Sequence, residues 1–201
     1  MPEKSVDISA DGKTMRTARL VLRPWSADDA DAALAIYGSD KVARWLAPAM
    51  SRVVGLDAMR ELMSCWAANC AVLEAPAGRW AIERQDDNAL IGGVALLPLP
   101  PYGIDHEIAW QLAPAAWGHG YGAEAGHAVA HYAFTSGMDE LFAVVRPGND
   151  KGARTARRVG MEWVGETKKY YNLNLQVYRL RRSDLDLPDL VIGYPDGRVD
   201  P

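Results

Sequence analysis

The stretch Trp110–Phe134, WQLAPAAWGHGYGAEAGHAVAHYAF, joins a predicted strand to a predicted helix through a glycine-spaced loop. Glycine lets the backbone approach a ligand closely, and the amides that open a helix point outward without partners. Together with the helix dipole, such amides favour an anion, above all a phosphate group. A plain turn entering a helix has the same pattern, so the loop alone does not decide between the two. The residues that alternate in this loop are Gly118, His119, Gly120, Tyr121 and Gly122.

The length and composition of the chain indicate one globular domain with a substantial core. Of its 201 residues, 49% are hydrophobic and 24% are charged. We expect a flexible N-terminal lead over 1–15, a folded domain over 16–182 and an acidic, flexible tail over 183–201. The tail has five Asp and one Arg, which leaves 21 acidic and 21 basic residues before it. A neutral body of this kind argues against a general nucleic-acid binder.

The same composition favours a cytoplasmic protein. No run of eighteen apolar residues occurs, so we expect no membrane span, and the first residues have no apolar segment typical of a secretory signal. Cys65 and Cys70 lie five apart in a predicted helix, on different faces, which disfavours a bridge between them. We expect buried, reduced thiols in a cytoplasmic setting.

The spacing of apolar residues predicts alternating groups of strands and helices. Predicted strands lie at 19–23, 79–84, 89–97, 106–111, 141–145, 162–165 and 175–180. Predicted helices lie at 26–37, 40–46 and 53–70, from the glycine loop to 134, and at 151–159. This order is typical of a mixed α+β fold in which helices cover a sheet.

Five short motifs follow one another along these elements. They are TARLVLRP at Thr17–Pro24, LIGG at Leu90–Gly93, EIAWQLAP at Glu107–Pro114, WGHGYGAEA at Trp117–Ala125, and Asn149 with Gly160–Met161. In this order they resemble the GNAT superfamily of acyl-CoA-dependent N-acetyltransferases and, within it, the RimJ/RimL branch. The resemblance covers roughly residues 16–182. It implies an α+β fold whose mixed, mostly antiparallel central sheet is flanked by helices, with the fourth and fifth strands splayed apart.

Two other glycine-loop proteins fit the sequence less well. A dinucleotide-binding loop belongs in a leading βαβ unit, whereas this loop follows an antiparallel-looking hairpin in the middle of the chain. A nucleotide P-loop needs Lys followed by Ser or Thr after its last glycine, and Ala123-Glu124 stand there instead.

The resemblance implies that the protein transfers an acetyl group from acetyl-CoA to a primary amine by direct attack. The acceptor would be a protein N-terminus or a small-molecule amine, and a homodimer is frequent in the resembling family. The alternative is a non-catalytic acyl-CoA-binding protein or partner module of the same fold. The implied coenzyme A residues are Gln111, Leu112, Trp117, Gly118, His119, Gly120, Tyr121, Gly122, Ala123 and Asn149.

A basic stripe follows the implied coenzyme site. Lys151, Arg154 and Arg158 fall at i, i+3 and i+7 of the last predicted helix. We expect Lys151 and Arg154 to reach phosphates, although a solvated helix face explains the same spacing.

The reaction needs a base, because amines are largely protonated near neutral pH. Glu107 is the first choice, since it lies on the strand that leads to the glycine loop. A carboxylate that only pairs within the sheet is the other interpretation. Asp105 and His106 come next as candidate bases.

The general acid is less evident. Many members of the resembling family have Tyr seven residues after the Asn, where this chain has Ala156, and its RimJ/RimL branch often has Ser at the position of Gly152. Tyr171, or its neighbour Tyr170, could reach in from the C-terminal strands. We take Tyr171 as the candidate acid, although packing explains both side chains equally well.

Two other groups of residues have alternative readings. Glu124, His127 and His131 share one helix face at a spacing that could bind zinc, but no fourth ligand is evident and we expect no metal. Tryptophans could line an acceptor pocket, although core packing is their more frequent use. The tryptophans concerned are Trp45, Trp66, Trp80 and Trp110.

Overall fold

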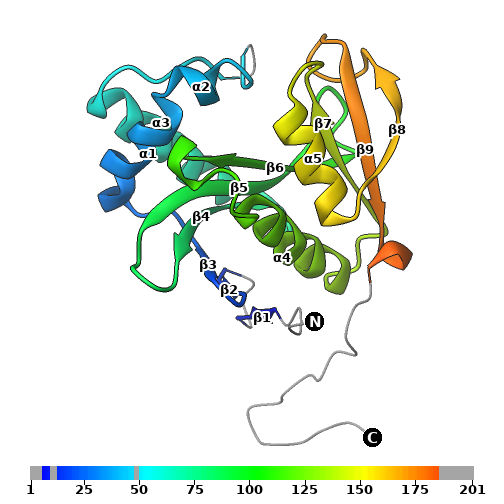
Figure 1. Ribbon diagram of the computed structural model, residues 1–201, viewed down its shortest axis with the longest axis horizontal. Coiled ribbons are helices and arrows are strands. Elements are labelled where there is room, and N and C mark those ends of the chain that lie inside the picture. Colours follow the sequence, from blue (N-terminus) through cyan, green and yellow to red (C-terminus); the bar gives the residue numbers. More distant parts are fainter. Residues whose placement is uncertain (1–5, 10–12, 48–49, 186–201) are drawn as a thin grey trace, which may run out of the picture.

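A computed structural model describes residues 6–9, 13–47 and 50–185. One nine-stranded sheet crosses the molecule in the order β1-β2-β3-β4-β5-β6-β7-β9-β8. Helices α1, α2 and α3 lie on one side of its central strands, and α4 and α5 lie on the other (Figure 1). The architecture is therefore α+β, with helices on both faces of a mixed, mostly antiparallel sheet, as the sequence predicted.

The strands are β1 (Asp7–Ile8), β2 (Met15–Arg16), β3 (Leu20–Arg23), β4 (Gly78–Arg84), β5 (Leu90–Pro98), β6 (His106–Leu112), β7 (Glu140–Val145), β8 (Glu162–Thr167) and β9 (Leu175–Arg181). The α-helices are α1 (Ala30–Tyr37), α2 (Asp40–Ala43), α3 (Leu56–Cys70), α4 (Tyr121–Thr135) and α5 (Asp150–Val159). Three 3₁₀ turns complete the elements: η1 (Ala27–Asp29), η2 (Pro114–Ala116) and η3 (Arg182–Asp184). None of the described helices is long and apolar enough to cross a membrane.

Most element boundaries differ from the predicted ones by a few residues, for local reasons. The first predicted helix begins as the turn η1, where Ser26 and Asp29 form a capping box, and continues as α1. The third begins only at Leu56, because Gly55 has a φ of 92° that no helical residue adopts. Asp7, Ile8 and Met15 lie within the expected flexible lead, yet together with Arg16 they pair as β1 and β2.

The predictions of an acidic tail and of buried cysteines have different outcomes. Most of the predicted acidic tail, residues 186–201, lies outside the described residues. Both cysteines are free thiols, but the expectation that they are buried is wrong: Cys65 is exposed on α3, and Cys70, at the end of that helix, is only partly buried. That helix buries only the stripe of Met59, Met63 and Trp66.

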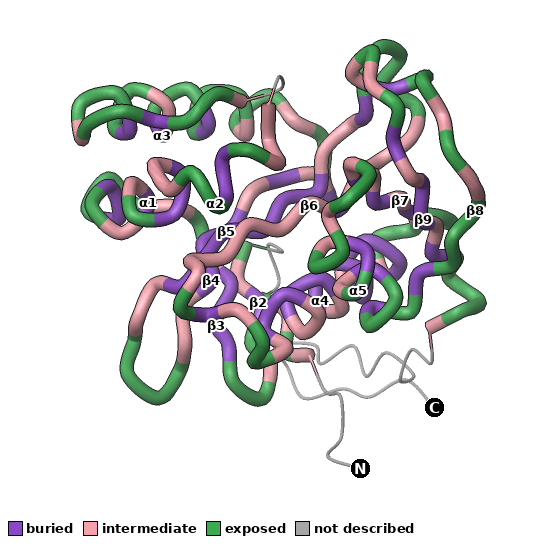
Figure 2. Tube along the Cα trace, turned by 45° about the horizontal axis from the view of Figure 1, so that its top comes forward, coloured by how far each residue is buried: buried purple, intermediate pink, exposed green. Residues whose placement is uncertain are grey.

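Most residues of β4 and β5 are buried (Figure 2), and the two faces of the central strands differ in kind. The face that packs against α4, here called the α4 face, is large and apolar and forms the main core. The opposite face, here called the α3 face, packs against α1 and α3, and its central positions are small or polar. Strand alternation assigns the residues. The α4 face presents Trp80, Ile82, Val94, Leu96 and Ile108; the α3 face presents Arg79, Ala81, Gly93, Ala95, Glu107, Ala109 and Gln111.

The sheet opens between β6 and β7. These two strands are parallel and pair only at Glu107 and Phe142, after which they diverge (Figure 1). β5 pairs with β6 along its whole length, and β7 pairs fully with β9. The sheet is therefore two well-paired halves joined at one point, which confirms the predicted splay of the fourth and fifth main strands.

Candidate active site

Glu107 lies where β6 and β7 part. It is partly accessible to solvent yet surrounded by protein, as a carboxylate at the bottom of a cleft would be. The hydroxyl of Tyr171 donates a hydrogen bond to its Oε2 atom at 3.0 Å. The structure thus brings together the two residues that the sequence proposed as base and acid, although they are 64 residues apart.

An unusual turn places Tyr171. The amide of Leu173 donates to the carbonyl of Tyr170 at 3.2 Å, and the two residues between them have φ of 54° each. Positive φ at both central positions is the signature of a type I′ hairpin turn. Asn tolerates this conformation, as at Asn172, but Tyr rarely adopts it. The turn that joins β8 to β9 therefore holds Tyr171 against its backbone preference, which is typical of a functional position.

A second anchor fixes the same turn beside β6. Asp105 accepts hydrogen bonds from Lys169 and from the hydroxyl of Tyr170, the latter at 2.8 Å. The Lys169 ammonium group holds the pKa of Asp105 below its usual value, and burial opposes this effect. Asp105 is therefore a structural anion. The alternative base and acid, Asp105 and Tyr170, are bonded to each other and not to Glu107 or Tyr171.

Burial tunes both members of the Glu107–Tyr171 pair. Burial raises the pKa of Glu107 to about 7, against the opposing effects of the Tyr171 hydroxyl, the Val144 backbone and the charge of Arg79. Burial and then the nearby Glu107 charge raise the pKa of Tyr171 well above its usual value. A carboxylate with a pKa near 7 suits a general base at neutral pH, and a phenol that keeps its proton suits a donor.

The glycine loop opens α4 with unpaired amides. Gly118 and Gly120 have φ of 87° and 84°, which only glycine adopts without strain, and the amides of residues 118–122 have no acceptor in the described chain. Gly122 is different: it lies within α4 and packs against Thr155 and Leu112. Unpaired amides at the start of a helix can bind an anion, so the loop is a candidate anion site, here called the cradle, while Gly122 serves helix packing instead of the turn.

Arg19 braces this cradle from below. Its Nη1 donates to the carbonyl of His119 at 3.1 Å, and its Nε donates to Glu124 at 2.7 Å. The hydroxyl of Thr17 also donates to Glu124, at 2.6 Å. Glu124 is therefore an anchor for β3 and the loop, which leaves it unsuited to the zinc alternative. No group of three or more His, Cys, Asp or Glu in the described residues is arranged to hold a metal.

The other predicted coenzyme residues lie around the cradle, and several are already engaged. The carbonyl of Leu112 accepts from the indole of Trp117 at 2.9 Å, and Gln111 accepts from the Tyr37 hydroxyl at 3.3 Å. The ammonium group of Lys151 lies 3.7 Å from the centre of the Trp117 ring. Ala123 is in the first turn of α4, and His119 stacks on Tyr121.

Asn149, just before α5, and Arg154, within it, have mainly local contacts. Asn149 caps α5 and accepts from the amide of Gly152 at 3.1 Å. A side chain at Gly152 would press against the Asn149 amide group, which caps the helix. Arg154 folds back to the carbonyl of Asp150 at 3.2 Å. The predicted reach of Arg154 towards phosphate stays a prediction.

Sequence reasoning missed Trp25, Tyr37 and Arg79, which lie on or beside the α3 face. Tyr37, Trp25 and Trp66 form an aromatic cluster with ring centres 5.1 to 6.2 Å apart. The Arg79 guanidinium lies 5.3 Å from the Trp66 ring centre. Among the tryptophans considered for a pocket, only Trp66 is part of this cluster. The strand position of Trp80 places it in the α4 core, a distinction that strand parity could have drawn.

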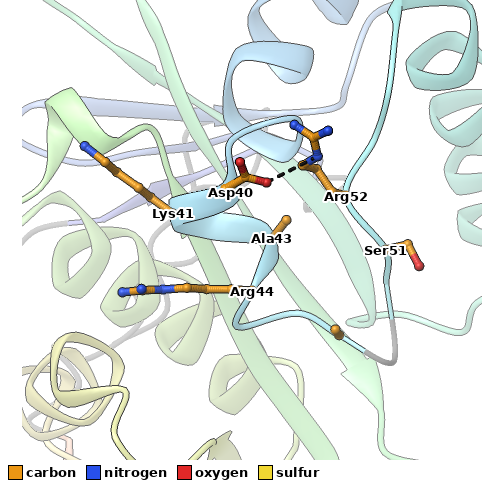
Figure 3. Close-up of a pocket in the computed structure, with 7 residues that line it drawn as sticks. Asp40, Lys41, Ala43, Arg44, Ser51 and Arg52 are labelled. Carbon is orange, nitrogen blue, oxygen red and sulfur yellow. Dashed lines mark ion pairs between the residues drawn. The ribbon is translucent and has the colours of Figure 1, made fainter.

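A separate open depression of about 460 Å³ lies along α2. Figure 3 shows Asp40 paired with Arg52 on one side, with Lys41 and Arg44 extended away from them. None of its lining residues belongs to the Glu107–Tyr171 pair or the cradle. Arg146, just after β7, fixes the segment that follows α2, because it donates to the carbonyls of Arg44 and Ala47 at 2.9 and 3.1 Å.

Comparison with known proteins identifies the arrangement. Residues 19–162 match the acetyltransferase (GNAT) domain family. The uncharacterized N-acetyltransferase YoaA of Bacillus subtilis is 27% identical over 162 residues, which are 80% of this chain and 89% of YoaA. The acetyltransferase of Agrobacterium tumefaciens superposes with a TM-score of 0.69 at 25% identity, covering 90% of this chain and 99% of that one.

A third similarity concerns the fold alone. The structure of Mycobacterium smegmatis RimJ, solved in complex with CoA-disulfide, has a TM-score of 0.69 at 19% identity and covers 83% of this chain and 84% of its own. The family match spans most of the chain and includes the cradle, Glu107 and the splayed strands. The chain belongs to the GNAT acetyltransferase family, whose acetyl donor is acetyl-CoA.

Proposed function

We propose that this protein is a cytoplasmic N-acetyltransferase that moves the acetyl group of acetyl-CoA to a primary amine, with Glu107 as base and Tyr171 as acid. The observation that carries the proposal is the 3.0 Å bond between these two side chains at the point where β6 and β7 part. A cofactor-binding module without activity has no need of a buried carboxylate bonded to a tyrosine in a disfavoured conformation.

The cradle fits the donor that the family uses. Gly118 and Gly120 leave their amides open, and a side chain built at Gly118 would meet no other atom within 4 Å. The amides of residues 118–122 would hold the pyrophosphate, and Lys151 lies near enough to the loop to add positive charge. When bound, acetyl-CoA supplies a thioester whose carbonyl carbon is open to an amine and whose sulfur leaves as a thiol.

The paired side chains supply the proton transfers. Ionised Glu107 accepts a proton from the attacking amine, which must lose one to become a neutral amide. The Tyr171 hydroxyl keeps its proton at neutral pH and can donate it to the departing sulfur. Because the two side chains are hydrogen-bonded, Glu107 can return its proton to Tyr171, and the pair ends in its starting state.

The proposed acceptor is the primary amine of a protein N-terminus or of a small molecule. The likeness to RimJ supports the fold and leaves the RimJ/RimL-like assignment as part of the proposal. The second candidate, a non-catalytic acyl-CoA-binding protein, is favoured by Ala156 and Gly152, since neither can supply the family's usual acid or hydroxyl.

Thermal melting and thioester cleavage test the proposal together. Acetyl-CoA at ~100 times its dissociation constant should stabilise the protein by about 2.7 kcal/mol, and a panel of primary amines should release free thiol. Gly120→Asp should abolish the stabilisation, because it adds charge and bulk at the phosphates. Gly137→Asp is the matched control, with φ of 97° at the other end of α4.

Each outcome separates the candidates. Stabilisation with amine-dependent thiol release supports the enzyme. Stabilisation without release from any amine supports the non-catalytic alternative. If Gly120→Asp is stabilised by acetyl-CoA as well as Gly137→Asp is, the cradle has been assigned wrongly.

A further inference from the structure

Arg79 of β4 is a half-buried arginine without a carboxylate partner in the described chain. Its contact is with the ring of Trp66, 5.3 Å from Cζ. Arg23, on the same sheet face, provides the contrast, because it is bound by Asp29 and Glu83 at 2.8 Å each. A partly buried charge without an anion is unfavourable unless a ligand supplies one.

Arg79 and Glu107 border one surface of small side chains. Arg79 is opposite Ala95, and Ala95 is opposite Ala109, so two methyl groups continue its row across the α3 face. Glu107 stands one alternation further along β6, on the same face. The strands of Arg79 and Glu107 are two strand spacings apart, or about 10 Å, a span that two extended side chains largely close.

The two charges already affect each other. Burial raises the pKa of Glu107, and the positive charge of Arg79 acts in the opposite direction. The same charge also lowers the pKa of Tyr37 and of Tyr171, against the larger effect of burial. The guanidinium is nevertheless more than 4 Å from every described carboxylate, so it does not form an ion pair with Glu107.

We propose that the acceptor carries a carboxylate a few bonds from its amine, as a free amino acid does, and that Arg79 binds this carboxylate while Glu107 receives the proton of the amine. The inference rests on the proposed function and names the acceptor class for the same site. Guanidinium groups bind carboxylates through two parallel hydrogen bonds, and the Arg79 guanidinium is positioned by its contact with the Trp66 ring.

Other amines fit this geometry less well. A polyamine would bring further positive charge next to Arg79 and be repelled. A peptide N-terminus offers a neutral carbonyl oxygen in place of the carboxylate, which is a weaker partner for a guanidinium.

The test compares acids with matched amides. Thiol release from acetyl-CoA is measured with α-, β- and γ-amino acids, with their carboxamides, and with short peptides of free N-terminus. The enzymes are wild type, Arg79→Met and Arg60→Met. Methionine keeps an apolar stem against Trp66, and Arg60 is the control, an exposed arginine on α3. Melting with the same amino acids in the presence of coenzyme A gives a reading that needs no turnover.

We expect wild type to prefer at least one acid over its amide by about 10- to 100-fold in kcat/KM, as a lost charged hydrogen bond would cost. Arg79→Met should remove that preference mainly through KM and abolish stabilisation by the acid. Because loss of the Arg79 charge acts on the pKa of Glu107 with either substrate, the ratio of acid to amide within each variant is the quantity compared. Arg60→Met should behave as wild type. Equal use of acids, amides and peptides, or an equal loss for all three in Arg79→Met, overturns the inference alone. Absence of thiol release with every amine overturns the proposed function as well.

Discussion

The two faces of the central sheet are built from alternate residues of the same three strands, yet they have opposite character. Leu96 and Ile108 on the α4 face are fully buried among apolar neighbours, whereas Ala95 and Ala109, next to them in sequence, face the polar side. The α4 face follows the ordinary rule that large apolar side chains fill a core. The α3 face breaks it with small residues and charges. The difference indicates that one face supports stability and the other supports the proposed chemistry.

One ionisable group on each side of the sheet shows the same contrast. His131 is buried in α4, and neither ring nitrogen has a hydrogen-bond partner in the described chain. Glu107 is also enclosed but has Tyr171 as a partner. Glu107, a partnered charge where β6 and β7 part, suits catalysis, whereas His131, an imidazole without a partner in the core, stays neutral.

The largest expected effect is on catalysis, from Glu107→Gln. Loss of the base should lower the acetyl-transfer rate by about 10²- to 10⁴-fold at pH 7. Stability at pH 8 should not fall, because the raised pKa of Glu107 means that its ionised form costs folding energy there. Glu140→Gln, an exposed position on β7, is the control. A wild-type rate in Glu107→Gln would remove Glu107 from the mechanism.

On the opposite face, Leu96→Ala should act on stability. Truncating a fully buried leucine should lower the free energy of unfolding by about 2 to 5 kcal/mol, as judged by denaturant melting. The KM values of the folded variant should stay near wild type. Val72→Ala removes an exposed apolar side chain and should change neither quantity. A large change in KM with Leu96→Ala would show that the two faces do not separate the two roles.

Tyr171→Phe should give a smaller effect on rate with a distinct pH signature. We expect a loss of about 10-fold in kcat, because water can replace the phenol as donor. The Tyr171 hydrogen bond lowers the pKa of Glu107, so its loss should move the rising limb of the pH–rate profile to higher pH. An unmoved limb would mean that the two side chains do not interact in the working enzyme.

The smallest effect concerns His131→Leu and acid stability. Burial lowers the pKa of His131 in the folded state. Below its unfolded value of 6.5 the unfolded chain gains the proton first, so His131 makes stability fall as pH falls through that range. His131→Leu should therefore reduce the loss of melting temperature between pH 7 and pH 5. An unchanged slope would show that His131 becomes protonated in place.

Much of this arrangement follows from local sequence signals, and the remainder does not. The glycine loop, the strand positions and Glu107 could be predicted because period-two alternation and glycine spacing are local. The proposed role of Arg79 could not be predicted, because it depends on Trp66 of α3 and Glu107 of β6, which are distant in sequence. Its position opposite Ala95 is likewise set by strand pairing. Tyr171 was only a candidate, since its approach depends on a turn that Tyr disfavours. The hydrogen bond between Arg19 and Glu124 likewise joins residues that are 105 apart in sequence.

The pH dependence of acetyl transfer tests the central claim most directly. With wild type and a reactive amine at saturation, kcat should rise with pH through an apparent pKa of about 7 and then level off, since ionised Glu107 is the active form. Glu107→Gln, measured in the same buffers, should be slow and lack this limb. A wild-type profile that is flat from pH 6 to 8, or a limb that survives in Glu107→Gln, would contradict the assignment of Glu107 as the base.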